Sequence, residues 1–250
     1  MSRECFQLLV ITALLISPAQ AHGHRHGLWS VISAECVPSS RSGIFEKCLS
    51  VDLSSGEENG VAILKDLRGA SHILAIPTRQ VSGIEDAFLQ TGNAPNYFAA
   101  AWTARKFVSK LLKRELPDEA IAIAVNSKLS RTQDQLHLHV DCIDIDVANA
   151  LAAYGVAVDL QWHLMTTPLK ERYYWIRRLH SVDLLDINPF QLLAEEVPGA
   201  KVNMDKHSLA IVARPASAGA VEFLLLTDSA DSGSGGHSED LQDLRCKIAE

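Results

Sequence analysis

Residues 135–141 read Gln-Leu-His-Leu-His-Val-Asp, and this short alternating stretch decides the fold prediction. Side chains two positions apart lie on the same face of a β-strand. Gln135, His137, His139 and Asp141 therefore share one face at steps of about 7 Å, while two leucines and a valine form the other. We predict a strand whose apolar face packs into the core. Imidazoles act as nucleophiles, proton carriers or metal ligands, so the polar face is a candidate site.

The polar face has three interpretations. A half-solvated strand with polar residues needs no function, because two of the ten histidines can fall in this pattern by chance. A His-x-His pair with Asp141 could instead bind zinc, helped by the histidine-rich segment at 22–27, although a closed zinc site needs four ligands. The third interpretation is phosphoryl-transfer chemistry, in which an imidazole attacks phosphorus.

Composition indicates a globular protein. Of 250 residues, 47% are hydrophobic and 21% are charged, which is enough for one large domain or two small ones. The formal net charge is −7, so nothing in the sequence indicates electrostatic binding to nucleic acid.

Residues 1–21 have the pattern of a secretory signal peptide. Arg3 precedes an apolar run at 8–16, and Ala19-Gln20-Ala21 fits the small-x-small cleavage rule. The run is well short of the about 20 residues that span a bilayer. We predict export, a mature chain that begins near His22, and one folded domain at 22–250. An uncleaved membrane anchor is the alternative.

Cysteine usage agrees with export. Removal of Cys5 leaves an even set, which in an exported protein predicts two disulfides but allows three pairings. We expect Cys36–Cys48, which closes a short loop, and Cys142–Cys246, which ties the histidine strand to the C-terminal segment. Four buried free thiols are the alternative.

The remaining pattern predicts an α+β fold, in which an antiparallel sheet is packed with helices. Hairpins are predicted from paired apolar runs, and helices from apolar residues at helical spacing. The predicted hairpins are 61–64 with 72–77, 121–125 with 135–143, and 208–213 with 221–227. The predicted helices are 28–37, a long one that starts at 95–96 and is stopped by Pro117, 146–154, 189–197 and 239–249. The Gly- and Ser-rich segment at 229–238 is predicted to be flexible.

The histidine strand, with Asn126 shortly before it, resembles the histidine-triad (HIT-like) superfamily of nucleotide hydrolases and transferases. The pattern of that superfamily is His-x-His-x-His-x-x, with apolar residues at x. From about residue 28 onward the chain is also similar to the CDP-diacylglycerol diphosphatase (pyrophosphatase) family. The segments that carry this likeness are 63–66, 72–78, 83–86, 101–105, 126–127, 131–133 and 193–198.

The resemblance implies a HIT-like fold that hydrolyses CDP-diacylglycerol to CMP and phosphatidate without a metal or cofactor. It makes His137, the central triad position, the nucleophile that attacks phosphorus. Gln135 replaces the first histidine of the pattern, and Gln135, His139 and Asn126 become candidate donors to the phosphoryl oxygens. A register shifted by two residues would instead make His139 the nucleophile, with Asp141 at the third position.

Lys65 and Arg131 are candidate substrate-binding residues, since their charges could meet the diphosphate. The resemblance further implies a lipid substrate at a membrane surface, in the periplasm or on the periplasmic face of the bacterial inner membrane. Three rivals remain: an exported hydrolase of a soluble nucleotide diphosphate, a metal-binding protein, and a lipid-binding module without catalysis.

Overall fold

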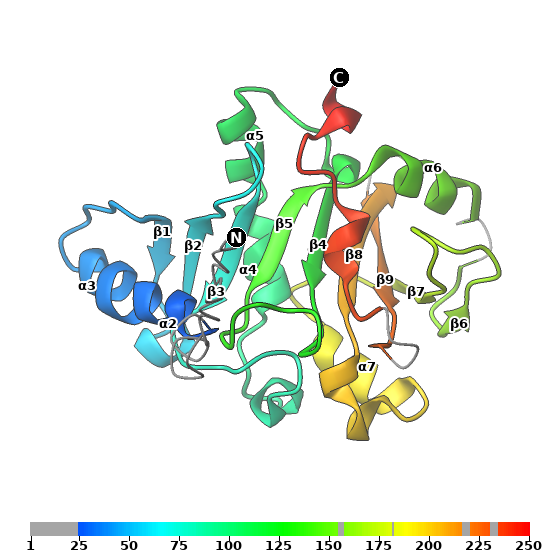
Figure 1. Ribbon diagram of the computed structural model, residues 1–250, viewed down its shortest axis with the longest axis horizontal. Coiled ribbons are helices and arrows are strands. Elements are labelled where there is room, and N and C mark those ends of the chain that lie inside the picture. Colours follow the sequence, from blue (N-terminus) through cyan, green and yellow to red (C-terminus); the bar gives the residue numbers. More distant parts are fainter. Residues whose placement is uncertain (1–24, 155–157, 182, 217–220, 231–234) are drawn as a thin grey trace, which may run out of the picture.

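One antiparallel sheet organises the molecule. The computed structural model describes residues 25–154, 158–181, 183–216, 221–230 and 235–250. Within these ranges nine strands form a sheet in the order β1-β2-β3-β5-β4-β8-β9-β7-β6 (Figure 1). The strands are β1 Cys48–Asp52, β2 Val61–Lys65, β3 Ile73–Pro77, β4 Ile121–Val125, β5 Leu138–Cys142, β6 His163–Leu164, β7 Trp175–Leu179, β8 Leu209–Pro215 and β9 Val221–Thr227. The predicted mixed fold with a large antiparallel sheet is confirmed.

Short helices cover both faces of the sheet. The α-helices of the described residues are α2 Gly27–Val31, α3 Val37–Ser40, α4 Tyr97–Ala104, α5 Lys106–Leu112, α6 Ile145–Tyr154 and α7 Pro189–Glu196. A π-helical turn, Ile32–Cys36, joins α2 to α3. Single 3₁₀ turns lie at Glu57–Asn59, Ala87–Gln90, Asp118–Ala120, Ala200–Val202, Met204–Lys206, Ser238–Leu241 and Lys247–Ala249. Among the described residues, no helix combines the length and the apolar character that crossing a membrane requires.

Strand β5 lies inside the sheet, paired with β3 on one side and β4 on the other. His139 stands opposite Leu74 of β3 and Ala124 of β4. The apolar face of β5, including Leu138 and Val140, is fully buried in the core cluster that contains the residues of α4. The strand therefore buries one face and turns His139 toward the other, as the alternation predicted.

The opposite face of the sheet carries two separate apolar clusters. One joins α2 and the π-helical turn to β1, β2 and β3, and includes Ile32, Ala62 and Leu74. The other joins α6 and the 3₁₀ turn Ser238–Leu241 to β4, β7, β8 and β9. In Figure 1 the blue helices and the red C-terminal segment lie over two different parts of this face, with β5 between them. His139 of β5 thus lies between these two clusters.

The structure confirms most predicted elements and corrects the start of one strand and the continuity of one helix. All three predicted hairpins are present as antiparallel pairs. Strand β5 begins only at Leu138, so Gln135 and His137 precede the strand instead of belonging to it. The long helix is divided at Arg105, which pairs with Asp118 at 2.7 Å.

The predicted helix at 239–249 is wrong. The backbone N–H of Asp243 donates to the carbonyl of Cys142 at 2.9 Å, and Gln242 forms a β-bridge with Ile143. Cys246 then takes a left-handed conformation, with φ of 53°, which a helix does not accept. The segment follows the end of β5 because its backbone finds partners there.

Both predicted disulfides are confirmed. Cys36–Cys48 joins the π-helical turn to the start of β1, and Cys142–Cys246 joins the end of β5 to the C-terminal segment. The second closes a separation of 104 residues and so fixes the C-terminus beside the histidine strand. The predicted signal peptide at 1–21 and its cleavage site lie outside the described residues.

Candidate active site

A cavity of about 780 Å³ opens where β5, the turn between β2 and β3, α2 and the C-terminal segment meet. Its size is that of a site for a medium-sized organic ligand. The side chains that form its apolar wall are Leu28, Val31, Leu64, Leu67 and Leu74. Those that form its polar part include Lys47, Lys65, Asp66, Arg68, Asn126, Arg131, His137, His139, His237 and Glu239. The cavity therefore combines a histidine floor with cationic and apolar sides.

His137 is held by the backbone just before β5. Its Nδ1 lies 2.6 Å from the carbonyl oxygen of Gln135, and a carbonyl only accepts, so Nδ1 carries the proton. The other nitrogen, Nε2, then keeps its lone pair. Burial lowers the pKa of His137 below its ordinary value of 6.5, so the ring is neutral at neutral pH. The arrangement supplies an unprotonated, fixed imidazole nitrogen at the cavity.

His139 is coupled to a second buried histidine that sequence alone did not assign to the site. The Nδ1 of His139 lies 3.0 Å from the Nε2 of His72, the residue just before β3. The Nε2 of His139 lies 3.6 Å from the Oε2 of Glu239. Since a carboxylate favours an N–H beside it, His139 is protonated on Nε2, and His72 donates to its Nδ1. Burial, with the neighbouring His137 and His72, places the pKa of His139 well below 6.5.

Glu239 connects the histidines to the cationic side of the cavity. Its carboxylate accepts from the Nδ2 of Asn126 at 3.0 Å and is ion-paired with Arg68. The backbone N–H of Glu239 donates to the Oδ1 of Asn126 at 3.1 Å. Both ends of the Asn126 amide are therefore used to hold Glu239, which lies 3.6 Å from both His139 and His237.

Gly236 brings the C-terminal segment to the site. Gly236 accepts from the backbone N–H of Ser127 at 2.7 Å, and its own N–H donates to Asp228 at 2.8 Å. A Cβ on Gly236 would lie 2.5 Å from the Oγ of Ser127, and φ there is 65°. The predicted flexibility of 229–238 is therefore wrong at 235–238, where the backbone is bonded to the loop after β4; residues 231–234 lie outside the described residues.

Gln135 is placed differently from the predicted phosphate donor. Its side chain is fully buried beside the loop that follows β3. The amide donates to the carbonyls of Pro77 at 3.1 Å and Arg79 at 2.9 Å, and it accepts from the N–H of Val81 at 3.3 Å. These three bonds use the amide to fix the loop, so its contribution to the site is the backbone carbonyl that orients His137.

We predict that Gln135→His destabilises the protein without raising activity. A neutral imidazole has one donor and one acceptor, so it cannot replace all three amide contacts. Leaving a buried backbone group unpaired costs about 1–3 kcal/mol in the free energy of unfolding. Urea denaturation measures this loss, with the exposed Gln161→His as the control. Unchanged stability together with faster turnover would place residue 135 in the site.

Two predicted substrate-binding cations, Lys65 and Arg131, make hydrogen bonds or ion pairs within the protein. Lys65 donates to the carbonyls of Asp66 at 2.6 Å and Gly69 at 2.7 Å, within the turn between β2 and β3. Arg131 pairs with both carboxylate oxygens of Glu85, at 2.6 and 2.7 Å. Both cations nevertheless line the cavity.

Asp141 is fully buried one step further along β5. It accepts from the Oγ of Ser71 at 2.7 Å, and burial raises its pKa to about 6. A carboxyl so enclosed does not favour the shifted register in which Asp141 would contact substrate.

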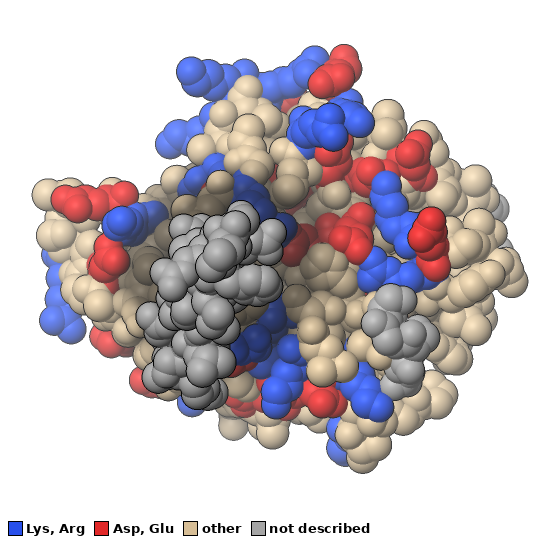
Figure 2. Space-filling view, viewed as in Figure 1, with Lys and Arg blue, Asp and Glu red and all other residues tan. Residues whose placement is uncertain are grey.

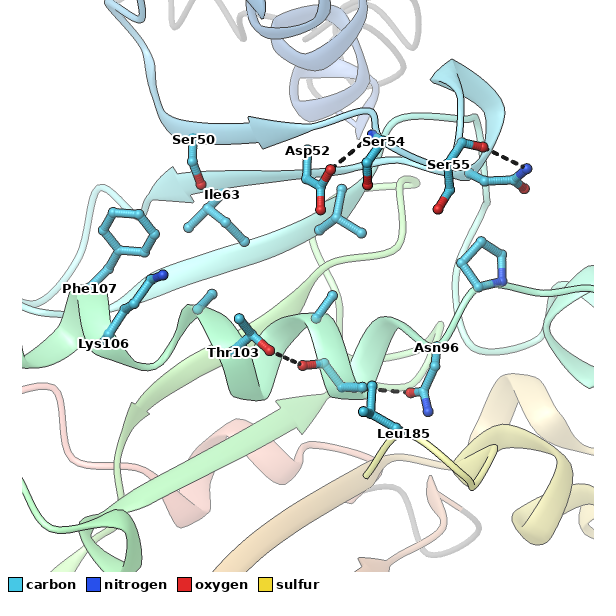
Figure 3. A pocket seen from close by; sticks show the side chains of 16 residues that line it. Ser50, Asp52, Ser54, Ser55, Ile63, Asn96, Thr103, Lys106, Phe107 and Leu185 are labelled. Atoms are coloured by element: carbon cyan, nitrogen blue, oxygen red, sulfur yellow. Dashed lines mark hydrogen bonds between the residues drawn. The ribbon is translucent and has the colours of Figure 1, made fainter. Parts of the chain in front are cut away.

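A second cavity, of about 490 Å³, lies on the other side of β2, between β1, β2 and α4 (Figure 3). Its polar groups serve local structure: Thr103 donates to the carbonyl of Ala99 at 3.0 Å, and Asn96 caps α4 by accepting from the N–H of Ala99 at 3.0 Å. None of the histidines in the described part of the chain lines it. The candidate active site is therefore the histidine cavity.

Comparison with known proteins agrees with this geometry. The family model described as CDP-diacylglycerol pyrophosphatase matches residues 23–250. The chain belongs to this family. A CDP-diacylglycerol pyrophosphatase of Yersinia pestis is 37% identical over 244 residues, which cover 96% of this chain and 91% of that protein. The matched residues include the whole histidine cavity and the C-terminal segment that completes it.

In this pyrophosphatase-family chain, one group within the described ranges has the composition of a metal site. Asp66, His72 and His139 each offer a ligand atom, and these atoms lie within 4.8 Å of one another. Three such ligands are the number found in catalytic zinc sites. The set differs from the predicted His137, His139 and Asp141, because His137 faces Gln135 and Asp141 is bonded to Ser71.

The sequence alone did not assign three residues to the site, namely His72, His237 and Glu239. His72 falls in the predicted strand 72–77, Glu239 in the predicted helix 239–249, and His237 in the segment predicted to be flexible. The usable signal was the spacing Gly235-Gly236-His237-x-Glu239-Asp240, in which chemistry-bearing side chains follow two glycines.

On the face drawn in Figure 2, acidic and basic side chains are interspersed among the described residues, with no extended basic surface there.

Proposed function

We propose that this protein hydrolyses CDP-diacylglycerol to CMP and phosphatidate through a covalent intermediate on His137. Membership of the CDP-diacylglycerol pyrophosphatase family supports the overall reaction. The observation that supports the intermediate is the 2.6 Å contact between the Nδ1 of His137 and the carbonyl of Gln135, because it leaves Nε2 unprotonated at the cavity.

The reaction runs in two displacements. The Nε2 of His137 attacks the phosphorus joined to cytidine, so a P–N bond forms and the bond from phosphorus to the bridging oxygen breaks. Phosphatidate leaves with the bridging oxygen. Water then attacks the same phosphorus, the P–N bond breaks, and CMP is released. His139 donates its Nε2–H to the developing charge on the phosphoryl oxygens, which lowers the barrier.

The cationic and the apolar sides of the cavity bind different parts of the substrate. Arg68, Lys47 and Lys65 lie where the diphosphate charges are stabilised, and Leu28, Val31 and Leu64 lie where the glycerol and acyl parts are held. Leu67, at the turn between β2 and β3, is fully exposed at the edge of the cavity. A lipid surface is a favourable environment for such a leucine. This supports a peripheral contact with the membrane that supplies the substrate.

The protein acts outside the cytoplasm, in a HIT-like fold formed by residues 22–250. The signal-peptide pattern of residues 1–21 supports export, and so do the two disulfides, since disulfides persist in oxidising compartments. The periplasm, or the periplasmic face of the inner membrane, is such a compartment. N-terminal sequencing of exported protein tests this: a first residue near His22 is expected, and Met1 would contradict cleavage.

The test of function is CMP release by the purified full chain from CDP-diacylglycerol in mixed detergent micelles. CMP and phosphatidate are expected in equal amounts, with and without excess EDTA. CDP-choline, a soluble nucleotide diphosphate, is the comparison substrate, and faster cleavage of it would favour the soluble-substrate hydrolase. Loss of turnover in EDTA, restored by zinc, would favour a metal mechanism at Asp66, His72 and His139.

The pH dependence follows from the neutral nucleophile. The pKa of His137 lies below 6.5, and only the unprotonated ring attacks phosphorus. As the pH falls, the midpoint of the decline in kcat/KM should therefore lie below pH 6.5. A pH series of initial rates in micelles measures this. An acidic decline centred above 6.5 would contradict His137 as a buried neutral nucleophile.

A further inference from the structure

His237 lies at the edge of the cavity with a carboxylate partner of its own. Its Nδ1 lies 2.8 Å from the Oδ1 of Asp240, so Nδ1 carries a proton and the ring is held in one orientation. Its Nε2 lies 3.6 Å from the Oε2 of Glu239, the carboxylate that also faces His139. The side chain is 32% exposed. His237 also lines the cavity, so its ring is open both to water and to a ligand there.

The charges around His237 favour its protonated form. Asp240 and Glu239 come from the same 3₁₀ turn, and the hydrogen bond to Asp240 is the main cause that raises the pKa of His237 above 6.5. Burial and Arg172, which precedes β7 and is ion-paired with Asp240, oppose this effect. Arg68, from the turn between β2 and β3, is ion-paired with Glu239.

The proposed two-step reaction needs a proton donor and then a base. The leaving oxygen belongs to a phosphate monoester, whose second pKa is about 6, so a donor assists modestly. The attacking water has a pKa of about 15.7, so a base assists more in the second step. His137 is already used as the nucleophile, and His139 as the donor to the phosphoryl oxygens, with its Nδ1 bonded to His72. A third imidazole that is partly exposed and lines the cavity fits this need.

We propose that His237, oriented by Asp240, is the acid–base residue of the reaction. In the first step its Nε2–H gives a proton to the bridging oxygen as the bond to phosphorus breaks and phosphatidate departs. In the second step the neutral Nε2 takes a proton from the water that attacks phosphorus, while the electron pair of the P–N bond returns to His137. The proton given in the first step is replaced in the second, so His237 ends as it began. This role rests on the proposed intermediate at His137.

Rapid-quench kinetics on the full-length enzyme separate the two steps. The substrate is CDP-diacylglycerol labelled in the cytidylyl group, in mixed micelles, and the label on protein is followed with time. For His237→Ala, breakdown of the adduct should slow by about 10²–10⁴-fold and its formation by less, so labelled protein accumulates. His163→Ala is the matched control, since His163 and Asp159 also pair at 2.8 Å but are exposed and away from the cavity.

The variant Asp240→Asn gives a second measurement that a merely structural role would not move. Without the carboxylate the pKa of His237 falls, so the decline of kcat/KM at high pH should move to lower pH. Added imidazole should restore part of the adduct breakdown in His237→Ala. Equal slowing of both steps, or a rise in KM alone, would reduce His237 to a binding cation and overturn the proposal. Absence of adduct in the wild type would instead contradict the proposed function itself.

Discussion

His137→Ala should remove turnover of CDP-diacylglycerol almost completely, by about 10⁴–10⁶-fold in kcat, as the loss of a catalytic nucleophile does in other hydrolases. His137 presents an unprotonated Nε2 because its Nδ1 bonds to the carbonyl of Gln135 at 2.6 Å. The neighbouring His139 has no free lone pair to replace the nucleophile, because its Nδ1 accepts from His72 and its Nε2, beside Glu239, carries a proton. The measurement is CMP release at saturating substrate.

The covalent adduct gives this prediction a direct chemical test. Wild-type enzyme, quenched during turnover of cytidylyl-labelled substrate and digested, should carry the label on the peptide that contains His137. His163→Ala, an exposed histidine replacement, should retain wild-type activity and labelling. Label on His139 would move the nucleophile by two residues, and substantial turnover by His137→Ala would contradict covalent catalysis at this position.

The sequence contained the local part of this site and missed the part made by distant segments. Alternation in 135–141 was enough to predict which face of β5 is buried, because the period of two is a property of the strand itself. The same argument misplaced Gln135. The strand begins at Leu138, so the period does not extend to residue 135, and the amide turns to the loop after β3. A pattern predicts an orientation only within the element that carries it.

His72, His237 and Glu239 could not be assigned to the site from local pattern. They reach His139 through pairing of β3 with β5 and through bonds between Gly236 and Ser127, contacts that join segments far apart in the chain. The predicted Cys142–Cys246 disulfide was the single long-range signal, since it placed the C-terminal segment beside β5. The composition of 229–238 pointed the other way, because glycines that permit a special backbone conformation resemble those of a linker.

His139→Ala should lower kcat by about 10²–10³-fold, the usual effect of losing one donor to the transition state. His139 keeps its proton on Nε2, beside Glu239, only because its Nδ1 accepts from His72, at 3.0 Å. His72→Ala removes that partner and allows the other tautomer of His139, so it should cause a smaller loss through the same contact. His72→Gln, whose amide can still donate, should retain more activity than His72→Ala.

The decisive comparison is the double variant His72→Ala with His139→Ala. If His72 acts only through His139, the double variant should be no slower than His139→Ala alone, since residues that act as a unit give non-additive effects. The rates are compared as kcat/KM, and urea denaturation of each variant separates lost stability from lost orientation. Additive losses would mean that His72 contacts the substrate itself or holds a metal ion with Asp66. Retention of the wild-type rate by His139→Ala would remove this histidine from the transition state.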